Sequence, residues 1–466
     1  MLIRFRVTNY RSINETQEFS TLKGRVKIKP EHLGTEGNLS LLKFSAIYGA
    51  NASGKSNFIE AISLSKQIIY ANIPPGIGND YHRLQPQNKT KPTTFEYEIA
   101  IGSKCYAYGF DIILSEAKIT GEWLYEIALG RDDKLIFERE PAKDTNNQRF
   151  KLGKKYDKKT LKTYAEGMNT NTSSLFLHEM NSNKSDIYDK YTELSPIKSI
   201  YLWIMQNLSV TPAGLPLPSQ PFYVKEDFDI ELANKIIPSL GLGISKIELS
   251  DESIDSVYGQ LSPDKVQDLL KSAIFTIKQR EHAIGKKTES ANLVLQLQRQ
   301  YFILIIDVNT FEIQVKRLWF VHDGSPTLFD LAEESDGTQR MIDLIEILFA
   351  AANGSNSTYI IDEIDRSLHP ALTRRLIELY LQLADNTNMQ LIVTTHDSHL
   401  MDLNFLRRDE IWLINKNSNG ESEIYSLDQF NVRFDKKISR AYMEGRYGAI
   451  PTFTTVQLDT KPENRG

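Results

Sequence analysis

The chain has 466 residues, of which 41% are hydrophobic and 25% are charged, a composition typical of folded globular proteins and sufficient for two or three structural units. The formal net charge of −5 at pH 7 gives no reason to expect nucleic-acid binding from the overall charge. A local basic patch is still compatible with it, because net charge does not describe how the charges are distributed. Cys105 is the only cysteine, which excludes an intrachain disulfide and an all-cysteine metal cluster and fits a reducing cytoplasm.

Neither a signal peptide nor a membrane span is expected. Charged residues interrupt the apolar residues that follow Met1, which is typical of a strand rather than of a secretory signal. The most apolar helix candidate, residues 341–352, is broken by Asp343 and Glu346. We therefore expect a cytoplasmic protein with no membrane partner.

The N-terminal third combines strands with one helix. Residues 3–10 alternate in polarity, which predicts a half-buried strand, and residues 42–48 form a more apolar strand. A glycine-rich turn and a helix from residue 57 follow. Residues 93–137 alternate again around a turn at 102–103, which predicts an antiparallel sheet.

The middle of the chain, residues 149–309, is predicted to be largely helical, with helices near 197–206 and 263–280. It begins with a cluster of lysines: Lys151, Lys154, Lys155, Lys158, Lys159 and Lys162. Such a cluster indicates either a solvated face or a contact with nucleic acid, and the sequence leaves both open.

Strands and helices alternate in the last third. Strands are predicted at 301–308, 311–322, 358–361 and 390–395, and helices at 340–351 and 370–384. Apolar strands separated by helices predict an α/β fold with a parallel sheet. The polar end of the chain, from residue 457, is expected to be loose.

Residues 49–56, Gly-Ala-Asn-Ala-Ser-Gly-Lys-Ser, match the P-loop pattern between an apolar strand and a helix. In such a loop, backbone N–H groups surround phosphate at the start of a helix. Lys55 would reach the outer phosphates of ATP, and the Ser56 hydroxyl would bind Mg²⁺. The predicted nucleotide-binding residues are Gly49, Asn51, Ser53, Gly54, Lys55, Ser56 and Asn57.

A second motif, which is acidic, completes the predicted site. The strand at 358–361 ends in Asp362 and Glu363. Asp362 is expected to hold Mg²⁺, and Glu363 to act as the general base that activates water. Lys55 and Asp362 are 307 residues apart, which leaves room for whole domains between the two halves of one site.

Three further features resemble those of ABC-type ATPases. Ser335, Gly337 and Thr338 lie in a segment similar to a degenerate ABC signature, which faces the nucleotide of the opposite subunit. The alternative is a plain helix cap. Asp365 resembles the D-loop residue that contacts the partner subunit. His396 resembles the switch histidine that senses the γ-phosphate, and its 33-residue separation from Glu363 fits adjacent strands of one parallel sheet.

Two more residues are assigned by resemblance, each with an alternative. Gln85 or Gln87 suits the glutamine that contacts Mg²⁺ in ABC heads, and both equally suit a surface loop. Arg11 resembles an arginine that lies against phosphates in SMC-like and OLD-like ATPases, and a surface salt bridge is the alternative.

Several stretches together resemble one branch of this class: residues 7–13, 55–57, 334–338, 362–370 and 445–451. The pattern resembles the bacterial ATPases classed as AAA family fifteen, which are ABC-type by structure and include ATPases of the PARIS and AbiL anti-phage systems. The resemblance implies a discontinuous head, a mixed sheet beside an antiparallel β lobe, interrupted by the helical insertion. The implied segments are 1–148 and 310–430 for the head, 149–309 for a partner-binding insertion and 431–466 for an extension.

The same resemblance implies a function. We expect a homodimer or higher oligomer, paired through its heads, that hydrolyses ATP, responds to a phage-encoded trigger and controls a separate toxic effector such as a Toprim nuclease. OLD nucleases carry a Toprim domain after the ATPase, whereas residues 397–466 have no comparable acidic cluster, so nuclease activity is not expected here. The alternative is an SMC-like ATPase that binds DNA in repair or maintenance. A transporter subunit fits poorly, because such subunits lack so large an insertion.

Overall fold

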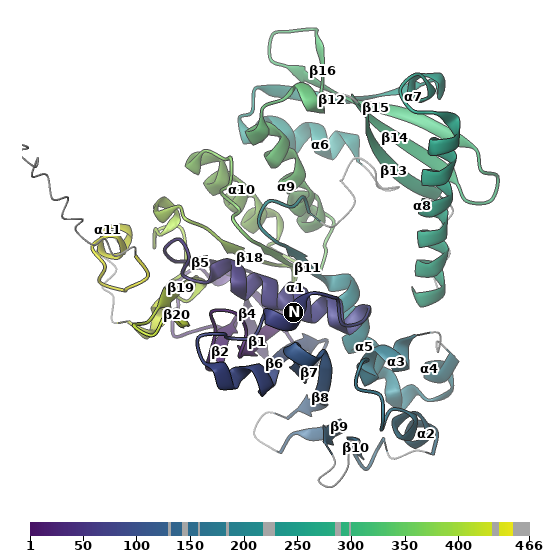
Figure 1. The fold of residues 1–466 in the computed structure, drawn as a ribbon. Helices are drawn as coiled ribbons and strands as arrows, with labels where there is room; N and C mark the ends of the chain where they lie inside the picture. Colours follow the sequence, from purple (N-terminus) through teal and green to yellow (C-terminus); the bar gives the residue numbers. More distant parts are fainter. Residues whose placement is uncertain are drawn as a thin grey trace, which may run out of the picture.

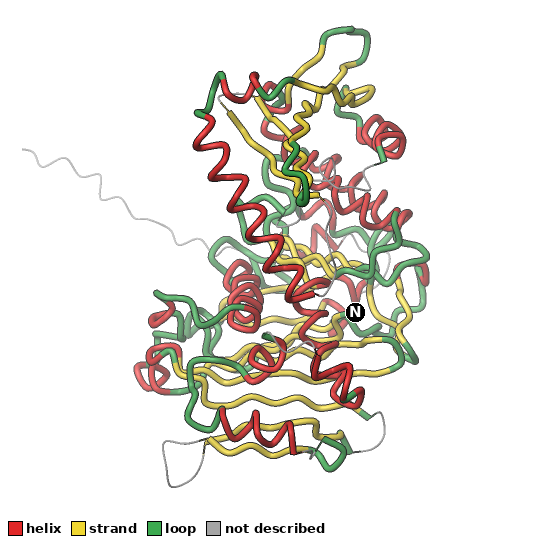
Figure 2. Tube along the Cα trace, turned by 90° about the vertical axis from the view of Figure 1, so that its right-hand side faces the viewer, coloured by secondary structure: helices red, strands yellow, loops and turns green. Residues whose placement is uncertain are grey.

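The computed structural model describes residues 1–128, 132–141, 148–156, 159–182, 186–217, 229–284, 290–297, 300–430 and 438–450. Two sheets with a helix between them form the body of the molecule, and a third sheet stands at one end (Figures 1 and 2). None of the helices in these ranges combines the length and the apolar character needed to cross a membrane.

The central sheet has six strands in the order β11–β17–β18–β5–β19–β20. Their bounds are β5 (Phe44–Tyr48), β11 (Leu208–Thr211), β17 (Thr358–Ile361), β18 (Gln390–Thr394), β19 (Ile411–Lys416) and β20 (Ser422–Ser426). All neighbours pair in parallel except β19 and β20. The three strands predicted at 42–48, 358–361 and 390–395 are confirmed, and each is buried along its whole length, as expected for a sheet covered on both faces.

Helices cover the two faces of this sheet. On one face, α9 (Asp336–Ala352) and α10 (Pro370–Leu383) share a hydrophobic core with β17 and β18. On the other, α1 (Lys55–Tyr70) packs between the central sheet and a second sheet. The helix that follows the P-loop is therefore held from two sides.

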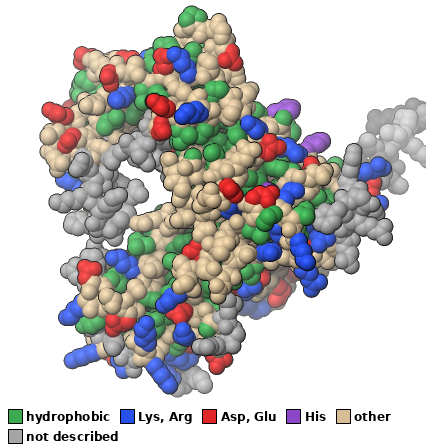
Figure 3. All heavy atoms as spheres, turned by 180° about the vertical axis from the view of Figure 1, so that it is seen from behind, with side chains coloured by type: hydrophobic (Ala, Val, Ile, Leu, Met, Phe, Trp, Pro, Cys, Tyr) green, Lys and Arg blue, Asp and Glu red, His purple; other side chains and the backbone are tan. Residues whose placement is uncertain are grey.

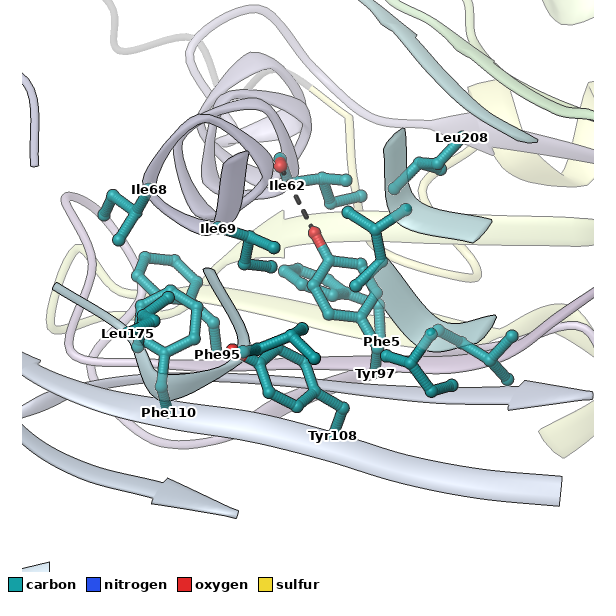
Figure 4. Close-up of a cluster of buried hydrophobic side chains, with 14 of the residues drawn as sticks. Phe5, Ile62, Ile68, Ile69, Phe95, Tyr97, Tyr108, Phe110, Leu175 and Leu208 are labelled. Carbon is teal, nitrogen blue, oxygen red and sulfur yellow. Dashed lines mark hydrogen bonds between the residues drawn. The ribbon is translucent and has the colours of Figure 1, made fainter. Parts of the chain in front are cut away.

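The second sheet is antiparallel, in the order β10–β9–β8–β7–β6–β1–β2, which confirms the predicted antiparallel lobe. Its strands are β1 (Leu2–Thr8), β2 (Gln17–Ser20), β6 (Thr93–Ile101), β7 (Lys104–Ile113), β8 (Lys118–Ile127), β9 (Lys134–Pro141) and β10 (Gln148–Leu152). Aromatic side chains from β1, β6 and β7 pack against α1 (Figure 4), and the Tyr97 hydroxyl lies 2.6 Å from Ser65 Oγ and 3.3 Å from Ile62 O.

Residues 149–309 differ from the expected helical insertion. The first part of this range belongs to the body of the molecule, and its strand β11 joins the central sheet. Four helices share a hydrophobic core with the antiparallel sheet: α2 (Lys159–Gly167), α3 (Phe176–Asn181), α4 (Asp186–Lys190) and α5 (Ser195–Leu202). The expected boundary at 148 falls at the start of β10, and that at 309 falls between two paired strands of the third sheet. β11 has only four residues, too short for a periodic pattern.

The third sheet has the order β12–β15–β14–β13, with β16 beside β15. Its elements are α6 (Ile230–Ile236), β12 (Ile244–Glu252), α7 (Asp255–Tyr258), α8 (Pro263–Ile284), β13 (Ser290–Leu297), β14 (Gln300–Asp307), β15 (Ile313–His322) and β16 (Leu328–Asp330). One face packs against α8 through Val266, Leu270 and Ile274, and the other shares the core of α6 and α9. The unit at 229–330 thus combines an antiparallel sheet with helices; the helix at 263–280 and the strands at 301–308 and 311–322 agree with the prediction, whereas β12 and β13 were not predicted.

Two smaller elements complete the described chain. β3 (Leu33–Glu36) pairs with β4 (Leu39–Leu42), and α11 (Ile438–Met443) packs near the central sheet through Tyr442, whose ring lies 6.3 Å from that of Tyr48. Most of the predicted extension, 431–437 and 451–466, lies outside the described residues.

Candidate nucleotide site

The P-loop connects β5 to α1, as its sequence predicts. A Cβ atom on Gly49 would overlap Ile414 O, and one on Gly54 would overlap Ser422 Oγ. Gly54 also has φ of +109°, a left-handed conformation that side chains disfavour. Glycine is therefore required at both positions by the close approach of β19 and β20.

Lys55 lies in a buried position at the first turn of α1. Its Nζ donates hydrogen bonds to Gly49 O (2.8 Å) and Ala50 O (3.1 Å). Burial lowers the pKa of Lys55 to about 8, and three carboxylates act in the opposite direction, those of Asp362, Glu363 and Asp365. The lysine thus shares its surroundings with the acidic residues that lie 307 or more positions away in the sequence.

The loop rests on a serine pair that sequence reasoning missed. Ser422 Oγ donates to Ser53 O (2.6 Å) and lies 2.8 Å from Ser12 Oγ, which accepts a hydrogen bond from Asn57 Nδ2 (2.7 Å). Asn57 is therefore connected to the P-loop backbone through the hydrogen bonds of Ser12 and Ser422. Ser53 Oγ is buried without a partner among the described residues, and Asn51 is exposed.

Asp362 follows β17 at the carboxyl edge of the central sheet, and it is 1% exposed. Its Oδ1 accepts a hydrogen bond from Thr394 Oγ1, and its backbone N–H donates to Thr211 O (2.9 Å). Its Oδ2 is buried with no hydrogen-bond partner among the described residues. Because an unpaired buried carboxylate oxygen is unfavourable, this geometry fits a residue that binds a cation.

The residues expected around Mg²⁺ partly converge. Asp362 and the P-loop start of α1, with Ser56, lie at the same edge of the sheet, because β17, β18 and β5 run in parallel. Mg²⁺ bound with a nucleotide commonly uses one or two protein ligands besides phosphate oxygens and water. Ser56 and Asp362 fit that donor set.

Glu363 and His396 come from neighbouring strands, as the spacing predicted. His396 Nε2 lies 3.9 Å from Glu363 Oε1, and the side chains are 39% and 34% exposed. Glu363 has φ of +50°, and its backbone N–H donates to Thr394 Oγ1 (2.8 Å). The His396 backbone N–H donates to Asp365 Oδ2 (3.1 Å), so the segments predicted to be the switch and the D-loop are directly connected.

The signature segment caps α9. Ser335 Oγ accepts a hydrogen bond from Thr338 N (3.2 Å) and lies 2.9 Å from Thr338 Oγ1, which is the helix-cap arrangement considered as the alternative. A Cβ atom on Gly337 would lie 2.7 Å from Ser367 O, so the signature and the D-loop touch. No hydrogen bond within the described ranges joins Ser335, Gly337 or Thr338 to the P-loop of the same chain.

Arg11 and Gln85 have other partners. Arg11 pairs with Asp80 (Nε to Oδ1, 3.0 Å) and with Glu60, so the salt-bridge alternative is the arrangement seen. Gln85 Nε2 donates to Glu421 Oε1 (3.2 Å), and Gln85 Oε1 accepts from Gln87 Nε2 (3.0 Å). Both ends of the Gln85 amide therefore have partners, Gln87 in the same loop and Glu421 between β19 and β20, and a role in Mg²⁺ binding stays a prediction.

The fold and the site define the class: an α/β P-loop ATPase head whose P-loop, paired acids and histidine meet at one edge of a mainly parallel sheet. A family model described as AAA domain, putative AbiEii toxin, Type IV TA system matches residues 44–402. The chain therefore belongs to this family of AAA-domain proteins. The narrower resemblance to AAA family fifteen and to the PARIS and AbiL ATPases stays a prediction.

Among solved structures, the chain is similar to the SMC head domain from Thermotoga maritima, with 13% identity, a TM-score of 0.34, and coverage of 91% of this chain and 98% of that one. It is also similar to an SMC head crystallised with the C-terminal winged-helix domain of ScpA, with 14% identity, a TM-score of 0.36, and coverage of 92% and 99%. No curated protein matches the chain significantly.

Proposed function

We propose that the protein hydrolyses ATP at composite sites formed by two copies of the chain. The observation that carries the proposal is the separation of two half-sites. Lys55, Asp362 and Glu363 gather at one edge of the central sheet, whereas no hydrogen bond in the described part of the chain joins Ser335 or Gly337 to that P-loop. In a symmetric pair, the segment of Ser335 and Gly337 in one copy can face the P-loop of the other copy.

The chemistry follows from the placement of the side chains. A water molecule attacks the γ-phosphorus, its proton passes to a carboxylate oxygen of Glu363, and the bond from the γ-phosphorus to the β–γ bridging oxygen breaks to leave ADP and phosphate. Lys55 binds the outer phosphates, and His396 lies close enough to Glu363 to contact the same γ-phosphate. A Mg²⁺ ion held by Ser56 and Asp362 would neutralise phosphate charge.

Two variants test this assignment. Lys55→Ala should abolish ATP binding, because the loop loses its only buried cation. Glu363→Gln should keep binding, lower the hydrolysis rate about 100-fold or more, and accumulate an ATP-dependent pair in size-exclusion chromatography with light scattering. Hydrolysis by Glu363→Gln at the wild-type rate would refute the assignment of the base, and ATP binding without pairing would refute the composite site.

In the cell, we propose that this cytoplasmic ATPase is the sensor and scaffold of an anti-phage system and controls a separate toxic effector. The family's description, which names a putative AbiEii toxin and a type IV toxin–antitoxin system, supports a role of this kind. Copurification from the native operon, with and without phage infection, tests it. If no partner is recovered and deletion of the gene leaves infection unchanged, the proposal is wrong.

An SMC-like DNA-binding ATPase is the second candidate, and exposed lysines favour it. Lys154, Lys155 and Lys159 are exposed near β10 and α2, whereas Lys151 pairs with Glu138 (3.3 Å) and Glu140 (2.8 Å). Figure 3 shows Lys and Arg side chains frequent over this end of the molecule. A DNA titration over a salt series decides: phosphate-driven binding weakens steeply as salt rises, and further when these lysines are replaced.

A further inference from the structure

Two arginines meet where the signature helix and the D-loop touch. Arg340 lies in the second turn of α9, and Arg366 lies in the D-loop between Asp365 and Ser367. Both contact one short loop that follows β11: Arg340 Nη1 donates to Leu215 O (3.4 Å), and the Arg366 guanidinium packs directly against Gly214. Gly214 and Leu215 therefore contact two positively charged side chains that lie next to each other.

The positive charge of this pair is only partly balanced. Burial lowers the pKa of Arg340, Asp343 acts against this effect, and Arg366 lowers the pKa further. Arg340 Nε is buried without a hydrogen-bond partner, and the Arg366 side chain has no ion pair within the described residues. Asp365 lies next in the chain, but its Oδ2 accepts from His396 N. Such a pair is suited to binding an anion that comes from outside the chain.

Two neighbouring residues of the D-loop, Asp365 and Arg366, lie near different parts of the molecule. Asp365 acts on the pKa of Lys55 in its own P-loop, whereas Arg366 acts on that of Arg340 in α9. Arg366 is exposed, and it lies beside the contact of Gly337 with Ser367 O. Arg366 thus shares the surface of the signature segment, on the side assigned above to the opposite copy.

We propose that Arg366 of one copy binds the terminal phosphates of the ATP held by Lys55 of the second copy, with Arg340 as a positioning residue. The inference rests on the proposed composite site and adds to it a charged group that acts across the interface. A guanidinium group offers planar paired donors to phosphate oxygens and stabilises charge that develops during phosphoryl transfer. Arg340 contributes by fixing the loop at Gly214 and Leu215 against which Arg366 packs.

Complementation between two inactive variants tests action across the interface. Arg366→Ala should lower kcat about 10- to 100-fold, and Lys55→Ala should be inactive. Co-expression with two affinity tags allows mixed pairs to be isolated. In such a pair, the intact P-loop of the Arg366→Ala chain faces the intact Arg366 of the Lys55→Ala chain, so we expect about half the wild-type rate per pair, since one of two sites is complete.

The outcomes separate this inference from the proposed function. Wild-type activity in Arg366→Ala, or mixed pairs no more active than their parents, would overturn the role of Arg366 while wild-type hydrolysis and pairing still support the composite ATPase. If Arg366→Ala reduces DNA binding and leaves ATP hydrolysis unchanged, the anion is a nucleic acid and the inference is also overturned. Arg440→Ala, which removes an exposed arginine paired with Glu444, is the control and should behave as wild type.

The positioning role of Arg340 has its own readout. Arg340→Met should raise the KM for ATP and lower kcat in the same mixed-pair assay, and Arg340→Lys should recover less than half of the loss, because an ammonium cannot reproduce the planar donors. Unchanged kinetics in Arg340→Met, with unchanged pairing, would contradict the positioning role.

Discussion

Thr394 is the structural link between the two acids of the candidate site. Its Oγ1 donates to Asp362 Oδ1 and accepts a hydrogen bond from the Glu363 backbone N–H at 2.8 Å. Thr394→Val keeps the shape of the side chain and removes both hydrogen bonds. The hydrogen bond to a charged carboxylate contributes about 1.5–3 kcal/mol and the neutral one about 1 kcal/mol, so the loss sums to about 3 kcal/mol.

If half or more of this loss appears in the transition state, kcat/KM falls about 10- to 100-fold. The assay is steady-state ATP hydrolysis over a range of Mg²⁺ concentrations. We expect Thr394→Val to need more Mg²⁺, because Asp362 then loses the one side-chain hydrogen bond that orients it among the described residues. Thr394→Ser is the matched control, since it keeps the hydroxyl group and should stay within a few-fold of wild type.

The reasoning would be refuted by a Thr394→Val variant that hydrolyses ATP within threefold of wild type at every Mg²⁺ concentration. Equal losses in Thr394→Val and Thr394→Ser would also refute it, because the loss would then not depend on the presence of the hydroxyl group.

Three further predictions concern other parts of the head. Gly54→Ala should lose ATP binding by 10-fold or more in a fluorescent-nucleotide titration, because a left-handed residue with a side chain costs about 1–2 kcal/mol and the new Cβ overlaps Ser422 Oγ. Burial lowers the pKa of Lys66 to about 8, so the unfolded chain binds more protons than the folded one between pH 8 and 10.5. The free energy of unfolding of wild type, relative to that of Lys66→Met, should therefore rise by about 2 kcal/mol from pH 7.5 to 9.5. Urea denaturation at the two pH values measures this rise. Glu122→Leu should lower the free energy of unfolding by about 3–5 kcal/mol in the same assay and leave the nucleotide site intact, because it removes the carboxylate that pairs with the buried guanidinium of Arg139.

Much of the central sheet could be predicted because its strands are continuous apolar runs next to recognisable turns. The strands at 358–361 and 390–395, and the antiparallel strands from residue 93, are strongly patterned. Within 149–309, the strand at 301–308 was predicted, whereas β11 and β12 were not, because β11 has only four residues and β12 carries four charged residues among nine. Their pairing is supplied by partners that lie far along the chain, such as β17 for β11.

The site divides in the same way. The P-loop and the acids Asp362 and Glu363 are legible in the sequence because phosphate binding and water activation need particular residues at fixed local spacing. Ser12, Ser422 and Thr394 carry no such pattern, and their roles arise from contacts between segments that are up to 410 residues apart.

By itself, the sequence determined the class of nucleotide site that we propose and the edge of the sheet where its residues lie, because a strand followed by a glycine-rich turn and a helix leaves the chain few other arrangements. Only the tertiary structure decided which residues support that chemistry, how residues 149–309 are shared between the body and the third sheet, and that Arg340 and Arg366 lie together. The physical reason is that such contacts depend on how sheets and helices pack in space, and local residue patterns do not encode that packing.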